Sequence, residues 1–289
     1  MRPLRAYRLC LLLTLPLFAL RLFEQQSGAI ERPSGFLASG FLWYHAAVLL
    51  LIAGCCCALR IIIKKSPESG EALPRPGASG ALLLLLSGAA ALVSGIVTIK
   101  EIGDEHLFIE LLMSRAQLLA VGASPDGFKL RFAAAAAGFI AALWFFIAGI
   151  KAFKKAPLWD GGFLALCVPL WPALTAISRF AHSPVNARDS VSVTQLAACM
   201  ALALACCCLT RGAALAEGKK TARRAAVFSL LAVYLAAGIK LADIGFYLAC
   251  GEESEAALTA ALTLAALAAA VCAAPKTTKP GEDGEKNEE

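Results

Sequence analysis

The chain of 289 residues is 59% hydrophobic and only 17% charged, and its mean hydropathy is +0.70. Soluble globular domains are about half apolar and about a quarter charged, so this composition argues against a soluble enzyme or binding domain. The formal net charge of +6 is small for this length, and no basic block carries interleaved aromatic residues, which argues against nucleic acid as a partner.

The apolar residues are concentrated in long runs, and these runs predict membrane-spanning helices. A run of about 18 or more apolar residues can cross the hydrocarbon core of a bilayer as a helix. Eight runs come close to this length: 7–23, 36–59, 80–99, 132–150, 161–178, 193–210, 225–249 and 256–274. We therefore predict an all-α polytopic membrane protein with eight transmembrane helices. Its partner is the lipid bilayer, and we expect it in the plasma (cytoplasmic) membrane.

The first run has a second interpretation. Arg2, Arg5 and Arg8 precede a short apolar stretch, as they would in a cleaved secretory signal peptide. No small-residue cleavage site follows within a few residues, because residues 20–29 read LRLFEQQSGA. We favour a retained helix, and cleavage stays open as the alternative.

The distribution of Lys and Arg predicts the orientation of the helices. When the N-terminus is placed in the cytoplasm, the cytoplasmic segments hold 18 of these residues and the outer segments hold 7. This excess agrees with the positive-inside rule, and the loops are short enough for the rule to apply. Both termini are therefore predicted to be cytoplasmic. The segment 275–289 is polar, charged and proline-containing, which predicts a disordered tail.

Landmarks recur in the two halves of the chain and predict an internal repeat. A proline-containing run ends at Arg21 in the first half and at Arg179 in the second, and the next run in each half ends in three adjacent cysteines. Units of four helices would keep the same orientation, so the halves would be related by an axis along the membrane normal. We predict two four-helix units, 1–159 and 160–274, followed by the tail 275–289. Chance similarity between Ala/Leu-rich segments is the alternative.

The cysteine triplets, Cys55–Cys57 and Cys206–Cys208, raise the question of a metal or redox site. Successive residues of an α-helix point about 100° apart, so three adjacent thiols of one helix cannot close on one ion. Structural zinc sites use spaced pairs, and the predicted cytoplasmic location is reducing. We favour packing of small, weakly polar side chains and predict no metal and no cofactor. Metal binding, redox chemistry and palmitoylation stay open as alternatives.

Stripes of small residues predict close contacts between helices. In lipid, small residues at a spacing of four let two backbones approach one another. The longest such stripe lies in the last run and comprises Ala257, Ala261, Ala265, Ala269 and Ala273. Shorter stripes lie in the third run, at Ser87, Ala91 and Gly95, and in the fourth, at Ala133, Ala137 and Ala141.

Charged residues within or beside the runs gather toward the predicted outer side. Lys240 and Asp243 lie three residues apart in one apolar run, hence on one face of a helix. A charge at this depth costs free energy unless it is paired or hydrated. We predict a polar cavity in the outer half of the bundle that binds a small anionic or zwitterionic solute. Its predicted substrate-binding residues are Lys240, Asp243, Arg21, Arg179, Lys100, Glu101, Asp104 and His45. The alternative is that these charges pair with one another or reach the lipid headgroups.

The segment 105–121 is predicted to form an amphipathic helix at the outer surface. Glu110, Ser114 and Gln117 follow the i, i+4, i+7 spacing of one polar stripe in an otherwise apolar segment. Such a helix would cover the outer mouth of the bundle.

Signatures of catalysis are absent from the sequence. It contains neither H-E-x-x-H nor G-x-S-x-G, and the segment 212–221 has the wrong spacing for a phosphate loop. The carboxylates of 252–255 are interpreted as solvated residues of a hairpin turn. We predict no catalytic residues and favour a small-solute transporter or a transporter subunit. A structural or accessory membrane protein is the second hypothesis, and an enzyme acting on lipid-linked substrates through His45, His106 or His182 is the third.

Overall fold

The computed structural model describes residues 3–28, 30, 42–65, 76–104, 125–154, 156, 163–182, 190–214 and 218–275. Within these ranges the structure is helical and contains no strand. Eight helical spans in the described ranges are long and apolar enough to cross a membrane. The prediction of an all-helical chain with eight such spans is therefore confirmed, and the architecture is consistent with an integral membrane protein.

The helices follow the predicted runs in order. The first span consists of α1 (Pro3–Leu12) and α2 (Thr14–Gln26), and the next four are α3 (Leu42–Lys65), α4 (Ala78–Asp104), α7 (Pro125–Phe153) and α8 (Phe163–His182). The sixth is α9 (Ser190–Ala214) and the eighth is α12 (Glu253–Ala273). The seventh is continuous but has three parts, α10 (Gly218–Val233), the π-helix η2 (Tyr234–Lys240) and α11 (Leu241–Ala249).

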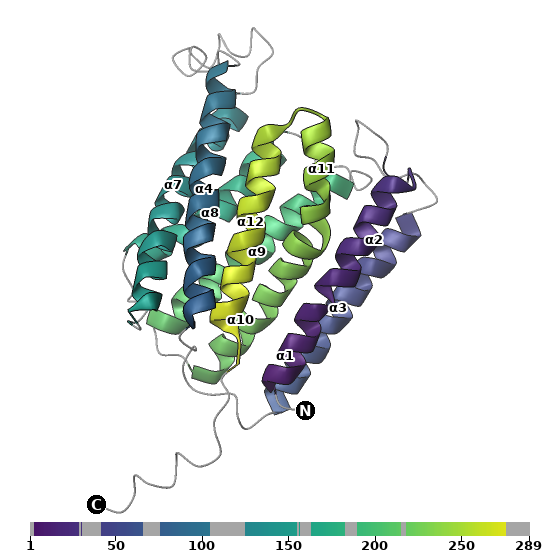
Figure 1. Ribbon diagram of the computed structural model, residues 1–289, viewed down its shortest axis with the longest axis vertical. Coiled ribbons are helices and arrows are strands. Elements are labelled where there is room, and N and C mark those ends of the chain that lie inside the picture. The colour runs from purple at the N-terminus through teal and green to yellow at the C-terminus, as the bar shows by residue number, and fades with distance from the viewer. Residues whose placement is uncertain are drawn as a thin grey trace, which may run out of the picture.

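The first span is interrupted at Leu13, which the sequence did not predict. Pro16 has no N–H to donate to the carbonyl of Leu12, so the helical ladder loses one bond at this point. The amide of Leu13 donates instead to the carbonyl of Cys10, three residues back, at 3.1 Å. The hydroxyl of Thr14 donates to the carbonyl of Leu11 at 2.6 Å. These local bonds join α1 to α2 with the chain still running in one direction (Figure 1).

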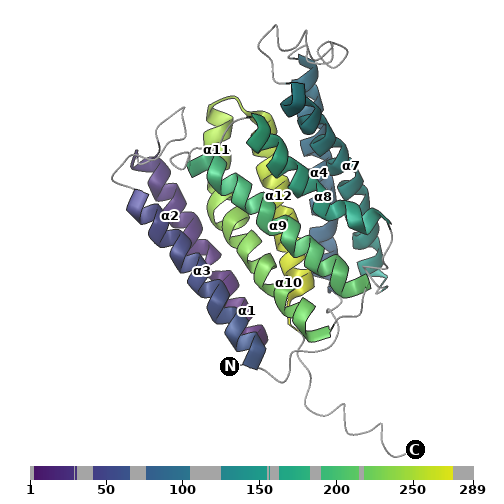
Figure 2. The same ribbon diagram turned by 180° about the vertical axis from the view of Figure 1, so that it is seen from behind.

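The spans pack as three neighbouring groups. Figure 1 shows α1, α2 and α3 along one edge of the bundle and α4, α7 and α8 along the other, with α10, α11 and α12 between them. In the reverse view of Figure 2, α9 crosses the central group, and it packs on α8, α10 and α12. Helix α1 begins, and α12 ends, at the same end of the bundle (Figure 1).

Most residues of the predicted small-residue stripes are buried at helix contacts, and Ala133 and Ala257 are half-buried. On α12, Ala261, Ala265 and Ala269 are buried, and this helix packs on α4, α9 and α10. Helices α4 and α7 also lie close together, since a Cβ built on Gly88 would lie 3.1 Å from the carbonyl oxygen of Ala142. A larger residue where these helices cross would therefore push the two backbones apart.

We expect Gly88→Leu to destabilise the bundle by about 1–3 kcal/mol, because the neighbouring atom is backbone and the two helices must separate. Gly54→Leu on α3 is the matched control, since no atom lies within 4 Å of a Cβ at Gly54. Reversible unfolding in mixed micelles measures both. Equal stability of the two variants would contradict close α4–α7 packing.

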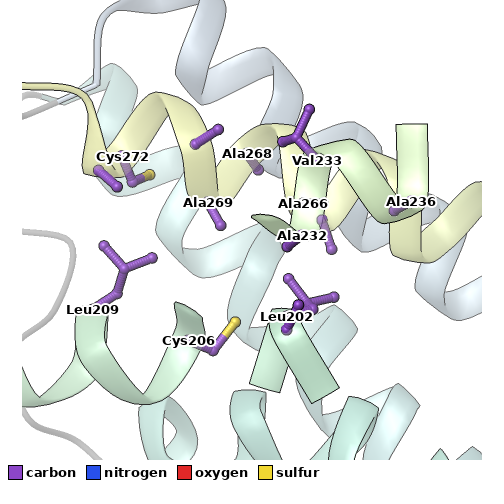
Figure 3. Packing of buried hydrophobic residues seen from close by; sticks show 14 of the residues in the cluster. Leu202, Cys206, Leu209, Ala232, Val233, Ala236, Ala266, Ala268, Ala269 and Cys272 are labelled. Carbon is purple, nitrogen blue, oxygen red and sulfur yellow. The ribbon is translucent and has the colours of Figure 1, made fainter. Parts of the chain in front are cut away.

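The cysteine triplets present their three thiols to different surroundings. Cys56, the middle member of the first triplet, and Cys206, the first member of the second, are buried, whereas Cys57 and Cys207 are exposed. Figure 3 shows Cys206 among α9 side chains that face Ala269 and Cys272 of α12. All eleven cysteines are free, and within the described part of the chain no three His, Cys, Asp or Glu side chains converge as a metal site. One thiol of each triplet is buried, which supports the packing interpretation for Cys56 and Cys206.

The internal repeat stays a prediction. Helices α3 and α9 carry the two cysteine triplets and are the predicted counterparts, yet their principal neighbours differ. Helix α9 packs on α8 and α10, the spans before and after it, whereas α3 packs on α1 and on α10 from the other half. The predicted amphipathic helix 105–121, with His106, lies outside the described residues, as does the tail beyond Pro275.

Candidate functional site

A buried ion pair joins the first and seventh spans. Arg21 on α2 donates from Nε to Oδ1 of Asp243 at 2.9 Å and from Nη2 to Oδ2 at 3.2 Å. Only 2% of Arg21 is exposed, and none of Asp243. Such a two-bond contact between guanidinium and carboxylate is short and directional, so it fixes the rotation of α11 relative to α2.

Two more charges complete this group. Lys240 Nζ lies 2.7 Å from Asp243 Oδ2, and Arg21 Nη1 donates to Glu24 Oε2 at 2.9 Å. The amide of Gln25 donates to Asp243 Oδ1 at 2.7 Å. We call Arg21, Glu24, Lys240 and Asp243 the ion network. It holds two cations and two anions, so it adds no net charge to the interior, and each charge has a partner, as a buried ion requires.

The π-helix helps to place this network. A π-turn holds one more residue than an α-turn and often occurs at functional sites. The last residue of η2 is Lys240, and Asp243 follows in the first turn of α11. Gly238 lies against α2, where a Cβ would be 3.2 Å from that of Leu17. The glycine thus allows η2 to approach α2 closely enough for the Arg21–Asp243 contact.

A chain of hydrogen bonds leads from the ion network into the bundle. Lys240 donates to the hydroxyl of Tyr247 at 2.8 Å, and this hydroxyl donates to Gln195 Oε1 on α9 at 2.8 Å. Gln195 Nε2 donates to Glu255 Oε2 on α12 at 3.4 Å, and Glu255 forms an ion pair with Arg179 on α8. Polar contacts therefore run without interruption from α2 to α8.

The far end of this chain opens into a cavity of about 850 Å³, a volume that includes the space at its mouth. The wall is formed by α4, α7, α8, α9 and α12. Its charged side chains are Arg131, Arg179 and Glu255, and Arg131 also pairs with Glu101 at 3.0 Å. The other polar side chains in the wall are Ser94, Thr98, Thr175, Ser178, Ser192 and Ser254, and Trp171 contributes an aromatic surface.

The cavity lies toward the end of the bundle where α11 turns into α12. Its residues come from the C-terminal half of α4, from the middle and C-terminal half of α8, from the N-terminal half of α7, and from the beginnings of α9 and α12. These parts of the helices lie opposite the end at which α1 begins (Figure 1). Two arginines, a carboxylate and several hydroxyls can bind a carboxylate, a phosphate or a zwitterion through charge-assisted hydrogen bonds.

The structure places six of the predicted site residues in two groups. Lys240, Asp243 and Arg21 form one cluster, and His45 Nδ1 lies 3.6 Å from Glu24 at its edge. Arg179 lines the cavity, and Glu101 pairs with another cavity residue, Arg131.

Lys100 joins neither group, and its role in solute binding stays a prediction. Its side chain is exposed, because its position on α4 is turned about 100° from that of Glu101. The side chain of Asp104 lies outside the described structure.

Sequence reasoning missed several members of the site. Glu24 lies three residues after Arg21 on the same helical face, and Gln195 is a lone amide in an apolar run, so both carried a local signal. Glu255 was wrongly interpreted as a solvated turn residue, since it pairs with Arg179 at the cavity wall. Arg131 and Tyr247 carried no local signal, because their importance depends on which helices become neighbours.

Comparisons with known proteins give no match: no protein-family model, no curated protein and no solved structure matches this chain.

Proposed function

We propose that this chain is a membrane transporter, or the membrane subunit of one, that binds a small anionic or zwitterionic solute in the cavity of α4, α7, α8, α9 and α12. The observation that carries the proposal is the pair of arginines, Arg131 and Arg179, in the wall of a cavity within the bundle. Charged side chains at this depth are costly in a membrane protein and typically mark solute or ion pathways.

The chemistry of the wall supports this class of solute. A guanidinium group presents a planar fork of N–H donors that matches a carboxylate or phosphate. Glu255 is the complementary partner for an ammonium group, and it already pairs with Arg179. When a zwitterion binds, its anionic group would pair with Arg179 and its ammonium group with Glu255. These contacts would replace the internal ion pair, so both protein charges would be paired with and without solute.

Ligand-induced stabilisation of the purified full chain tests the proposal. The probes are L-alanine, glycine betaine, succinate and inorganic phosphate, each measured separately by thermal unfolding in detergent. At least one should raise the unfolding temperature, since a ligand that binds only the folded state stabilises it. Arg131→Gln should abolish the effect, whereas Lys129→Gln, which removes an exposed charge two residues away on the same helix, should preserve it. A response that Arg131→Gln leaves intact would place binding elsewhere.

The proposed orientation has both termini in the cytoplasm, so the cavity lies toward the outside. The test starts from a chain in which the exposed native thiols are changed to Ser, namely Cys57, Cys207 and Cys250. A single cysteine is then introduced in place of Ser69 or Ser190. The two new thiols should lie on opposite sides of the membrane. An impermeant maleimide should reach the thiol at position 190 from outside, and the thiol at position 69 only after lysis. Labelling of both positions from one side would contradict the topology.

The accessory hypothesis is supported by the ion network, because its four charges have partners within the protein. Such a network can hold helices together without any ligand. Failure of all four probes, together with normal folding of Arg131→Gln, would favour this structural role.

A further inference from the structure

A second, smaller cavity lies between α2 and α3, on the opposite side of the ion network from the solute cavity. It is narrow, with about 10 Å³ open to the centre of a water-sized sphere, and its polar lining consists of Arg21, Glu24, Tyr44 and His45. Apolar side chains, among them Leu17, close the rest of the wall. We call this space the His45 chamber.

Four buried polar atoms of the His45 chamber have no hydrogen-bond partner within the described structure. They are Glu24 Oε1, the hydroxyl oxygen of Tyr44, and both ring nitrogens of His45. Glu24 is 3% exposed and His45 is 7% exposed. A buried polar atom without a partner costs about 1–3 kcal/mol, so a proton shared between His45 Nδ1 and Glu24 Oε1 would remove part of the cost that these described residues carry.

The chemistry of these atoms selects a proton rather than a metal ion. Calcium and magnesium take about six or more oxygen ligands, whereas Glu24 and Tyr44 offer one free oxygen each. His45 Nδ1 and Glu24 Oε1 are 3.6 Å apart, slightly beyond hydrogen-bond distance. A proton bound at Nδ1 would create an imidazolium that donates to the carboxylate after a small side-chain rotation. Histidine is the side chain that exchanges a proton most readily near neutral pH.

We propose that Glu24 and His45 form a proton-binding site that drives the transporter, its occupancy being linked to the solute cavity through the ion network. The proton comes from water and forms an N–H bond on neutral imidazole, while Glu24 stays a carboxylate. The charge of the network and chamber thereby rises from zero to +1. That the proton drives transport rests on the proposed function; that the site exists and is linked to the cavity does not.

The path for this linkage is the chain of contacts already described. Glu24 Oε2 accepts from Arg21, which holds Asp243 with its other two nitrogens. The groups that face the His45–Glu24 pair are Arg21 from α2 and Tyr44 from α3, and η2 adds only apolar Ile239. A new positive charge in the chamber therefore acts first on Arg21, and from there through Asp243 and Lys240 toward Tyr247.

Nitrogen-15 NMR of histidine-labelled full chain in lipid nanodiscs tests the proton site without any solute. The chain has only three histidines, and the signal lost in His45→Gln identifies His45. In the wild type this ring should change reversibly from neutral imidazole to imidazolium on acidification. Glu24→Gln removes the anion beside it, so the titration of His45 should differ from that of the wild type.

The matched control is Glu253→Gln, which removes an exposed carboxylate on α12 and should leave the titration of His45 unchanged. A His45 ring that stays neutral throughout the wild-type titration would overturn the proposal, even if Glu24→Gln does not fold. An equal response of His45 in wild type and Glu24→Gln would overturn it as well.

The linkage has its own readout at Trp171, one of four tryptophans and part of the cavity wall. With fluorinated tryptophan, the Trp171 signal should follow the protonation of His45 in the wild type. Tyr247→Phe removes the hydroxyl between Lys240 and Gln195, so it should abolish that response while His45 still titrates. A Trp171 response that survives in Tyr247→Phe, or that is absent in the wild type, would overturn the linkage.

Discussion

Asp243→Asn is expected to lower the free energy of unfolding by at least about 3–5 kcal/mol, the usual effect of breaking a buried ion pair. Asp243 accepts from both Arg21 and Lys240, so neutralising it leaves two buried cations opposite one carboxylate, Glu24. Lys240→Met should be milder, because Asp243 keeps its two bonds to Arg21. Reversible unfolding in mixed micelles measures this order.

The double variant Lys240→Met/Asp243→Asn completes the test. It should be more stable than Asp243→Asn alone, because Arg21 and Glu24 remain as a balanced pair. Glu253→Gln, which changes an exposed carboxylate, should stay within about 0.5 kcal/mol of the wild type. Additive losses in the double variant would show that Lys240 and Asp243 do not interact.

The fold was predictable because its strongest signal is local. A long apolar run identifies a membrane helix by itself, and all eight runs correspond to helical spans. The α-to-π change at Tyr234 and the interruption at Leu13 were not predicted. These two features depend on helix neighbours or on single hydrogen bonds. A hydropathy pattern contains no information about neighbours or hydrogen bonds.

The candidate site was predictable only where one helix carries the whole signal. Lys240 and Asp243 lie three residues apart on one span, and the structure buries both. The partners on other spans follow from packing, which no spacing in the sequence reports. Thus Arg21 meets Asp243 across 222 positions, while Glu101 pairs with Arg131 and Lys100 faces away.

Packing also separates two regions that the sequence joined into one. In place of the predicted single cavity, the structure has a closed ion network with Arg21, Lys240 and Asp243, and a separate open cavity with Arg179 in its wall. Gln195 and Tyr247 connect the two regions, and both are uncharged. A search of the sequence for charge therefore finds the two ends and misses the connection between them.

Glu255→Gln is expected to change the binding of anions and zwitterions in opposite directions. In the wild type Glu255 pairs with Arg179 and repels an anion in the same cavity. With the carboxylate neutralised, Arg179 becomes fully available, so inorganic phosphate or succinate should bind about tenfold more tightly. A zwitterion loses the partner of its ammonium group, a charge-assisted contact worth about 1.5–3 kcal/mol, and its affinity should fall by about tenfold or more.

Isothermal titration of the reconstituted chain with phosphate, succinate and L-alanine measures these changes, and Arg179→Gln provides the opposing variant. Arg179→Gln removes the cation and leaves Glu255 without its ion-pair partner, so it should weaken all three ligands. Because the two substitutions act on the same contact, the double variant should bind phosphate better than Arg179→Gln alone, since the repelling carboxylate is gone. If Glu255→Gln changes all three affinities in the same direction, Glu255 has no charge-selective role and the cavity does not distinguish anions from zwitterions through it.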